Sequence, residues 1–400
     1  MPKLKRDLTV EEQLARGPLD LPFLMLVVLL TCLGVIMVLS ASYATALNEG
    51  NPAAYYFIRQ GLFAAMGIAL MYVTSKINYQ SFRWMSVFVL GFALLLLVLV
   101  LLPGVHTNRS DGVKRWIRSL GPIPAFQPSE FAKLGVILYF SARMSKRGSE
   151  KPKQFNTRTY SGTLLQKLDG LGFTELIPYG VVLLVIMLLM KLEPHMSGTI
   201  LILIPAAAIL FAGGVRLGWF ALGGAGVGGL LLLTMAGYQS TRILVWKDPW
   251  AYPKDGGYQI IQSLYAIGSG GLFGVGFGQS RQKQLFIPEP ENDFIFSIVC
   301  EELGLIGAGL ILLLFALLIV RGYWIALHAR DRFGSLLAVG ITTLMAAQVF
   351  LNISVVTNLL PTTGISLPFF SYGGTALMIQ LIEMGIVLSV SRQIPAPKQG

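Results

Sequence analysis

The feature that most constrains this 400-residue chain is a series of apolar runs, each close to the length needed to cross a lipid bilayer. A membrane-spanning helix needs about 20 mostly apolar residues. Because the chain is 54% hydrophobic and only 13% charged, an ordinary soluble domain is excluded. The qualifying runs are residues 21–40, 55–74, 84–102, 127–142, 176–190, 198–214, 218–236, 294–320, 333–352 and 371–391. We therefore predict an all-α polytopic membrane protein with about ten transmembrane helices.

The Lys and Arg residues between the runs predict the orientation of these helices. With the N-terminus in the cytoplasm, the inner segments hold 19 Lys and Arg and the outer segments hold 10. Positive residues accumulate on the cytoplasmic side of membrane proteins, so both termini are expected inside. The net charge of +11 then reflects topology and anionic membrane lipids, and no nucleic-acid partner is predicted.

The same pattern predicts a single membrane domain, residues 21–391, between cytoplasmic tails at 1–20 and 392–400. A basic, polar cytoplasmic loop at 143–175 shows no catalytic constellation. A larger extracytoplasmic loop, residues 237–295, separates the seventh and eighth spans and is rich in aromatic residues, glycine and charge. The basic residues that remain outside, against the positive-inside trend, indicate an anionic partner on the outer face.

The stretch "IPEPENDFIFSIVCEELG", residues 287–304, holds five carboxylates, and the last three, Asp293, Glu301 and Glu302, lie in or against the eighth apolar run. Ionised groups next to a lipid-length segment are costly and usually functional. Asp293 could cap the helix that begins there, or it could act as a general base at the membrane surface. The pattern alone leaves both interpretations open. Glu301 and Glu302 lie two turns deeper and are expected to pair within the bundle.

Glu130 and Lys133, in "FQPSEFAKLG", are three residues apart on one helical face and can form an ion pair within the bilayer. Such a pair could be structural or functional. His195 has no second His or Cys nearby in the sequence, so no histidine-based metal site is predicted.

Two irregular segments interrupt the apolar pattern. Residues 357–375, "TNLLPTTGISLPFFSYGGT", form either a plain loop or a backbone-lined binding surface at the mouth of a cavity. The glycines between residues 268 and 278 do not have the spacing of a nucleotide-binding motif, and close helix packing or a flexible turn is expected there instead.

Five motifs occur in the order found in the SEDS family, the RodA, FtsW and SpoVE proteins of bacterial cell-wall synthesis. They are "GVKRWI", "FQPSEFAKL", "GGYQIIQSLYAIGSGGLFGVGFGQS", "PEPENDFIFSIVCEELG" and "LPTTGISLPFFSYGGT". The resemblance runs from the first span to the last. It implies a ten-span protein of the bacterial cytoplasmic membrane that polymerises lipid II into glycan strands on the outer face. It also implies a partner, a class B penicillin-binding protein that crosslinks the strands.

The resemblance also assigns residues. The essential acid of the family falls on Asp293, and its Arg-Trp pair falls on Arg115 and Trp116. The remaining motif positions fall on Gln127, Pro128, Ser129, Glu130, Lys133, Pro361, Thr362, Gly364, Pro368, Ser371, Tyr372, Gly373 and Gly374. Two departures, His195 in place of a family Asp and Thr363 in place of a Lys, favour the FtsW/SpoVE branch over RodA.

The family chemistry gives these residues expected roles. Asp293 would take the proton from the 4-hydroxyl of the acceptor sugar, which displaces undecaprenyl pyrophosphate from the donor with inversion. The cations that could stabilise the leaving group are Arg115, Lys114, Arg281 and Lys283. Mg²⁺ or Mn²⁺ could share that role with Glu289 as a ligand, and the sequence leaves the metal open.

Two other function classes stay open from the sequence. A lipid II flippase would need its charges along a path across the membrane, whereas a polymerase needs them gathered on one face. A non-catalytic scaffold for the penicillin-binding protein would make Asp293 dispensable. The choice between division, elongation and sporulation is not encoded in these motifs.

Overall fold

The computed structural model describes residues 17–107, 115–119, 125–147, 166, 172–234, 238–254 and 256–394. Within these ranges the regular elements are helices, and isolated β-bridges join Ile117 to His106 and to Phe126. The predicted cytoplasmic loop 143–175 and both predicted tails lie mostly outside the described residues. The all-α prediction is confirmed.

A long helix occupies each of the ten predicted apolar runs. In chain order the elements are α2 (Leu21–Ala41), α3 (Tyr43–Asn48), α4 (Tyr55–Lys76), α5 (Gln80–Leu99), α6 (Pro128–Met144), α8 (Phe173–Leu192), α9 (Met196–Ala212), α10 (Leu217–Thr234), α11 (Tyr238–Lys247), η1 (Pro249–Ala251), α12 (Gly257–Gly270), α13 (Ile295–His328), α14 (Arg332–Val356) and α15 (Gly374–Ser391). Seven of the described helices are long and apolar enough to cross a membrane: α2, α4, α5, α8, α13, α14 and α15. The full number of spans stays a prediction.

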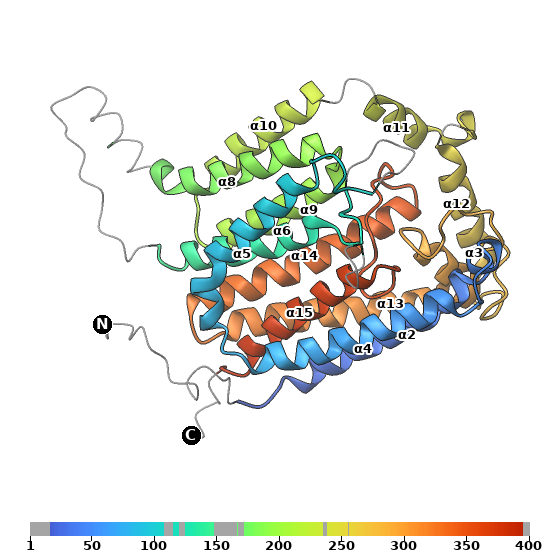
Figure 1. Cartoon of the computed structure of the whole chain (residues 1–400), viewed down its shortest axis with the longest axis horizontal. Helices are drawn as coiled ribbons and strands as arrows, with labels where there is room; N and C mark the ends of the chain where they lie inside the picture. The colour runs from blue at the N-terminus through green and yellow to red at the C-terminus, as the bar shows by residue number, and fades with distance from the viewer. Residues whose placement is uncertain are drawn as a thin grey trace.

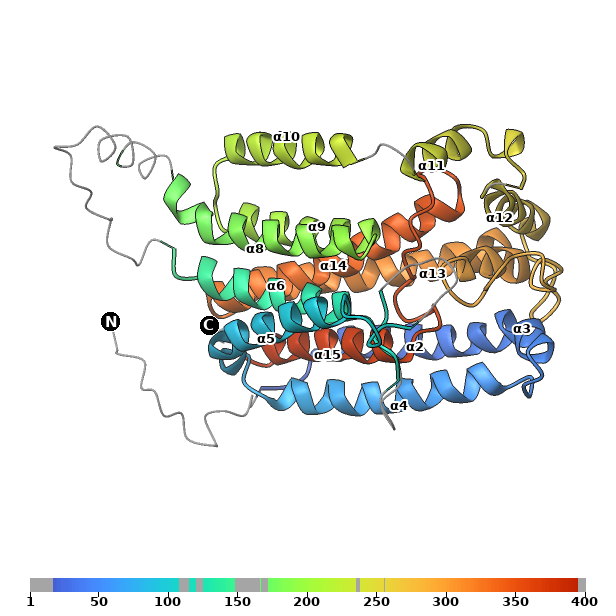
Figure 2. The ribbon, with the colours of Figure 1, turned by 45° about the horizontal axis from the view of Figure 1, so that its top comes forward.

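The long helices run side by side as one bundle (Figure 1). α14 and α15 form the centre of the bundle, since most of their residues are buried. Around them, α4 packs on α15 and α5 packs on α6 (Figure 2). The outer helices expose large apolar side chains such as Phe88 (71% exposed) and Leu184 (60%). An exposed apolar belt of this kind is costly in water and favourable in lipid, which supports a multi-pass membrane protein.

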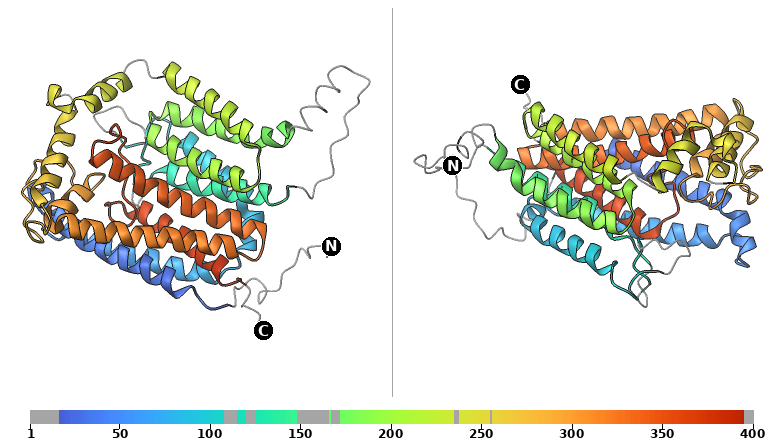
Figure 3. Two further views of the ribbon diagram at one scale, coloured as in Figure 1. Left: turned by 180° about the vertical axis from the view of Figure 1, so that it is seen from behind. Right: turned by 90° about the horizontal axis from the view of Figure 1, so that it is seen from above.

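Both ends of the described chain lie at the same end of the bundle. The Arg392 guanidinium donates to the Gly17 carbonyl at 3.1 Å, and Arg321 forms an ion pair of 2.9 Å with Asp20. α3, α11 and α12 lie at the other end (Figure 3), so the segment predicted between spans seven and eight is far from the chain ends. Which end faces the outside of the cell stays a prediction.

α13 differs from its predicted run, 294–320, in two ways. It continues to His328, because Arg321 is satisfied by Asp20 and by the face of Trp324, 4.1 Å from the ring centre, so the first charged residue does not end the helix. The predicted inner segment 321–332 is therefore largely helical. α13 is also interrupted at Gly304, whose φ of 66° and ψ of −171° are not helical.

The glycine-rich segment after α12 fills this interruption. Four main-chain hydrogen bonds of 2.9–3.1 Å join the two segments: Val275 to Glu301, Gly276 to Glu302, Leu305 to Gly271 and Ile306 to Leu272, donor first. A Cβ at Gly270 or Gly274 would overlap a carbonyl oxygen of α13. The glycines therefore permit close backbone packing, as the sequence predicted.

Replacing Gly274 should show how much this packing contributes. Gly274 has a φ of +79°, and an added Cβ would strike the Glu302 carbonyl, so Gly274→Ala should lower stability by about 2–4 kcal/mol in thermal unfolding of the purified protein. Gly278 has nearly the same φ, +77°, with no atom within 4 Å of its Cβ position. Gly278→Ala should therefore cost only about 1 kcal/mol. Equal losses from the two variants would contradict the packing role.

Candidate functional site

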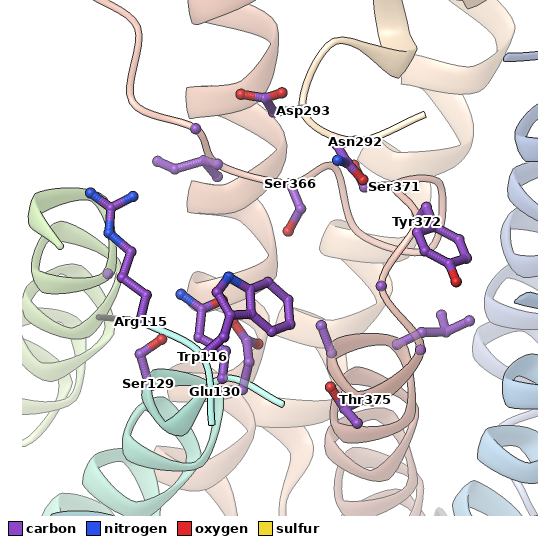
Figure 4. Close-up of a pocket in the computed structure, with 18 of the residues that line it drawn as sticks. Arg115, Trp116, Ser129, Glu130, Asn292, Asp293, Ser366, Ser371, Tyr372 and Thr375 are labelled. Atoms are coloured by element: carbon purple, nitrogen blue, oxygen red, sulfur yellow. The ribbon is translucent and has the colours of Figure 1, made fainter. Parts of the chain in front are cut away.

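A cavity of about 590 Å³ lies where α4, α6, α9, α14 and α15 meet the segments that precede α13 and α15. Most of the predicted site residues line it (Figure 4). They are Arg115, Trp116, Glu130, Lys133, Glu289, Asp293, Ser371, Tyr372, Gly373 and Gly374. These residues come from four distant parts of the sequence, so the fold itself assembles the site.

Two predicted substrate-binding residues, Arg281 and Lys283, do not line the cavity, and a third cannot be placed. Lys114 lies outside the described residues. Arg281 is exposed on the 280–283 turn and does not line the cavity. Lys283 is buried in the bundle, where its ammonium group is 2.9 Å from Glu302 and 2.9 Å from the Ser40 hydroxyl. Lys283 therefore lies away from the cavity with its charge paired to Glu302, and its role in substrate binding stays a prediction.

Glu301 and Glu302 hold the turn that carries Lys283. The Glu301 carboxylate accepts hydrogen bonds from the Ser280 hydroxyl and from the main-chain N–H groups of Arg281 (2.9 Å) and Gln282 (3.3 Å). Glu302 pairs with Lys283 and accepts from Ser40 at 2.6 Å. Both acids are therefore buried anchors, as expected, and they fix the segment that leads to Glu289 and Asp293.

Asp293 does not cap α13. The N-cap residue is Phe294, and the helix has no side-chain capping hydrogen bond. The main chain of Asp293 is held instead by Asn352 of α14, whose amide Nδ2 donates to the Asp293 carbonyl at 2.7 Å and to the Ile365 carbonyl at 2.8 Å. Its carboxylate faces Gly364, and an added Cβ there would lie 3.7 Å from Oδ2. Of the two interpretations that the sequence left open, the structure excludes the helix cap.

The electrostatics of Asp293 suit a base that works near neutral pH. Burial raises the pKa of Asp293 to about 6, the charge of Glu289 adds to the rise, and Arg242 of α11 opposes it. At pH 7 the group is then mostly ionised, yet it is a stronger base than an ordinary carboxylate. Burial also raises the pKa of the neighbouring Glu291 to about 7.

The irregular segment 361–373 is held rigidly by buried amides from three helices. Gln60 of α4 donates to the Ser371 carbonyl at 3.1 Å and accepts from the Gly373 N–H at 3.3 Å. Asn352 binds the Ile365 carbonyl, and Gln380 of α15 accepts from the Phe369 N–H at 3.2 Å. The backbone-lined surface is thus preorganised. The sequence analysis missed these three residues, although an amide within an apolar run was a usable signal.

On the other side of the cavity, Arg115 and Trp116 lie on the segment that pairs through Ile117 with His106 and Phe126. The Arg115 guanidinium donates to the Pro194 carbonyl, and Gln127 lies 3.2 Å from the His195 ring. Burial lowers the pKa of His195 to about 3, so the ring is neutral at physiological pH. His195 therefore contributes no positive charge toward an anionic ligand.

Lys133 and Glu130 form a buried ion pair of 2.7 Å on the first two turns of α6, at the wall of the cavity. Both partners line the cavity, so the pair lies where a ligand can reach it. In the described residues no group of three or more His, Cys, Asp or Glu side chains is arranged to hold a metal ion. A Mg²⁺ or Mn²⁺ at Glu289 and Asp293 would need ligands from a substrate, which is how Mg²⁺ usually binds next to phosphates.

Comparison with known proteins identifies the family. The family model described as "Cell cycle protein", for FtsW, RodA and SpoVE, matches residues 21–395. The chain therefore belongs to this family, and the resemblance found in the sequence is confirmed. It is 41% identical over 387 residues to a probable peptidoglycan glycosyltransferase FtsW of Geobacter metallireducens, across 94% of this chain and 95% of the relative. It is also 41% identical over 375 residues to stage V sporulation protein E of Bacillus subtilis, across 93% and 97% of the two chains.

Comparison with solved structures supports the same family assignment. A chain from a peptidoglycan synthase complex, described for its coordination of polymerization and crosslinking, superposes with a TM-score of 0.69 at 28% identity, covering 96% of this chain and 99% of that one. The rod shape determining protein RodA of Thermus thermophilus gives a TM-score of 0.62 at 26% identity, covering 95% and 98%. The shared fold thus extends over almost the whole chain.

Asn352 offers a test of how the site is held. Asn352→Leu keeps the branched shape of the side chain but leaves the Asp293 and Ile365 carbonyls without a donor, so stability should fall by about 2–4 kcal/mol in thermal unfolding. The matched control is Asn51→Leu, because Asn51 is only half-buried and bonds to Glu49 at the far end of α3. That change should alter stability by less than about 0.5 kcal/mol. A small effect at Asn352 would show that segment 361–373 is held by other contacts.

Proposed function

We propose that this protein is a peptidoglycan glycosyltransferase that polymerises lipid II into glycan strands. The observation that carries the proposal is the assembly of Asp293, Arg115 and Trp116 around one cavity, at the end of the bundle away from the chain ends. Membership of the FtsW, RodA and SpoVE family supports it, as do relatives named peptidoglycan glycosyltransferase.

In the proposed reaction the Asp293 carboxylate takes the proton from the 4-hydroxyl of the N-acetylglucosamine of one lipid II molecule. The resulting oxygen attacks C1 of the N-acetylmuramic acid of the donor, and the bond from C1 to the pyrophosphate breaks. The configuration inverts, and undecaprenyl pyrophosphate leaves as an anion. One base suffices, because a pyrophosphate leaves without a strong acid.

The leaving pyrophosphate needs cations, and the cavity supplies two. Arg115 presents a guanidinium, which can bind two phosphate oxygens at once. Lys133 can share its charge between Glu130 and a ligand, because the pair lines the cavity. A divalent cation bound between Glu289 and the pyrophosphate would add to this stabilisation.

We place the site on the outer face of the bacterial cytoplasmic membrane. The distribution of Lys and Arg supports this orientation, because the end that holds the cavity is the end with fewer of them. We also propose a class B penicillin-binding protein as the partner that crosslinks the product. The likeness to a chain of a peptidoglycan synthase complex supports a partner of this kind.

The experiment that tests the function is incubation of purified protein with lipid II, alone and with a class B partner, in detergent and in vesicles. A glycosyltransferase forms glycan polymer in detergent, where there is no membrane to cross. A flippase moves lipid II across the vesicle membrane and forms no polymer, and a scaffold does neither. Absence of polymer with the partner present would contradict the proposal.

The pKa of Asp293 predicts the pH dependence of polymerisation. The base must be ionised, so the rate should be maintained above about pH 6 and should fall as the pH drops below that value. Because the charge of Arg242 lowers this pKa, Arg242→Gln should move the fall to higher pH. Lys247→Gln, an exposed charge on the same helix, is the control and should leave the profile unchanged. If the rate of Arg242→Gln fell at the same pH as the wild-type rate, Asp293 would not be the titrating group.

A further inference from the structure

Besides Arg115 and Lys133, the cavity has a third basic side chain, which the mechanism does not use. Arg59, in the second turn of α4, lines the same cavity as Asp293 and Arg115. Its guanidinium carbon is 5.2 Å from the ring centre of Tyr55, Tyr55 packs on Tyr56 at 5.3 Å, and Tyr56 packs on Tyr372 at 4.9 Å. Figure 4 shows Tyr372 and Arg115 on opposite sides of Trp116. Arg59 therefore belongs to the flank away from Arg115.

Arg59 differs in its partners from the four cations of the bundle that form ion pairs. Among the described residues, Lys133, Arg147, Lys283 and Arg321 each form an ion pair with a carboxylate. Arg59 is exposed and donates to the Tyr55 hydroxyl, and no described carboxylate lies within ion-pair distance. A guanidinium in this state, at the edge of a cavity, keeps most of its donors for an anionic ligand.

The surface next to Arg59 fits a lipid chain. Leu62 and Met66 follow it by three and seven residues, so the three side chains share one face of α4. Leu62 is 61% exposed and Met66 is 47% exposed, on a helix apolar enough to cross a membrane. A polyprenyl chain lying along Leu62 and Met66 would bring its phosphate group to Arg59.

The chemistry of polymerisation requires two such groups. Each lipid II molecule carries a pyrophosphate and a polyprenyl chain, but only the donor loses its pyrophosphate in the reaction. The acceptor keeps its own, which must be held away from the reacting carbon while its sugar hydroxyl reaches Asp293. A cavity with one cation on each flank and a base between them meets this requirement.

We propose that Arg59, with the Tyr55 hydroxyl, binds the pyrophosphate of the acceptor lipid II, while Arg115 faces the pyrophosphate that leaves the donor. This assignment rests on the proposed function and extends it to a second lipid-binding subsite. Arg59 then acts in substrate binding and takes no part in proton transfer, which predicts an effect on concentration dependence more than on the maximal rate.

Binding of undecaprenyl pyrophosphate tests the proposal without turnover. Wild-type protein should bind two equivalents of undecaprenyl pyrophosphate at saturation. Arg59→Gln and Arg115→Gln should each bind one equivalent. Arg118→Gln is the matched control, because Arg118 is exposed in the same segment as Arg115 but does not line the cavity; it should keep two. Undecaprenol, which lacks the phosphates, should not compete. Two equivalents on a folded Arg59→Gln protein, or none, would overturn the assignment.

Polymerisation kinetics give a second readout. Arg59→Gln should raise the lipid II concentration for half-maximal rate by at least about tenfold, and Arg59→Lys should restore part of the loss. Arg118→Gln should match the wild type. An unchanged concentration dependence in Arg59→Gln would overturn the assignment.

The two experiments also separate the assignment from the proposed function. Wild-type protein that binds two equivalents and forms no polymer would contradict the proposed function and still support two subsites.

Discussion

The pairing of residues 271–276 with the interruption of α13 is the interaction on which the rest of the site depends. A membrane helix that breaks leaves main-chain groups without partners, and in an apolar surrounding these are expensive. Here the glycine-rich segment supplies those partners at Glu301, Glu302, Leu305 and Ile306. Because this segment also leads directly to Glu289 and Asp293, the contact that satisfies the broken helix fixes the position of the base at the same time.

A second consequence of this arrangement is a base with a raised pKa. Asp293 is placed by its main chain, through Asn352, and its carboxylate, which accepts a hydrogen bond from the Asp293 main-chain N–H, lines the cavity beside Gly364. Burial raises its pKa to about 6, while the main-chain hydrogen bond and, to a smaller extent, the charge of Arg242 limit the rise. The amides of Gln60, Asn352 and Gln380 hold the adjoining segment 361–373, so this wall of the site is ordered before any ligand binds.

The sequence predicted much of this because some features are local. Apolar runs of bilayer length gave the helices, and the "RWI", "QPSE" and "DFIF" motifs gave Arg115, Glu130 and Asp293, which the cavity brings together. Features that depend on packing were not accessible. Lys283 was expected to be an extracytoplasmic cation facing the substrate, but in the fold it is buried in an ion pair with Glu302. α13 was expected to end near Val320, but a partner at Asp20, 301 residues away, allows it to continue. Arg59 lies in none of the recognised motifs, and it became a candidate only because it lines the cavity.

The most direct test of the account is the polymerisation rate of Asp293→Asn compared with its affinity for lipid II. The amide has nearly the same shape as the carboxylate but is not basic. If Asp293 is the base, the rate should fall by about 10²–10⁴-fold while lipid II binds as it does to the wild type. A folded Asp293→Asn protein that polymerises lipid II at close to the wild-type rate would contradict the central claim.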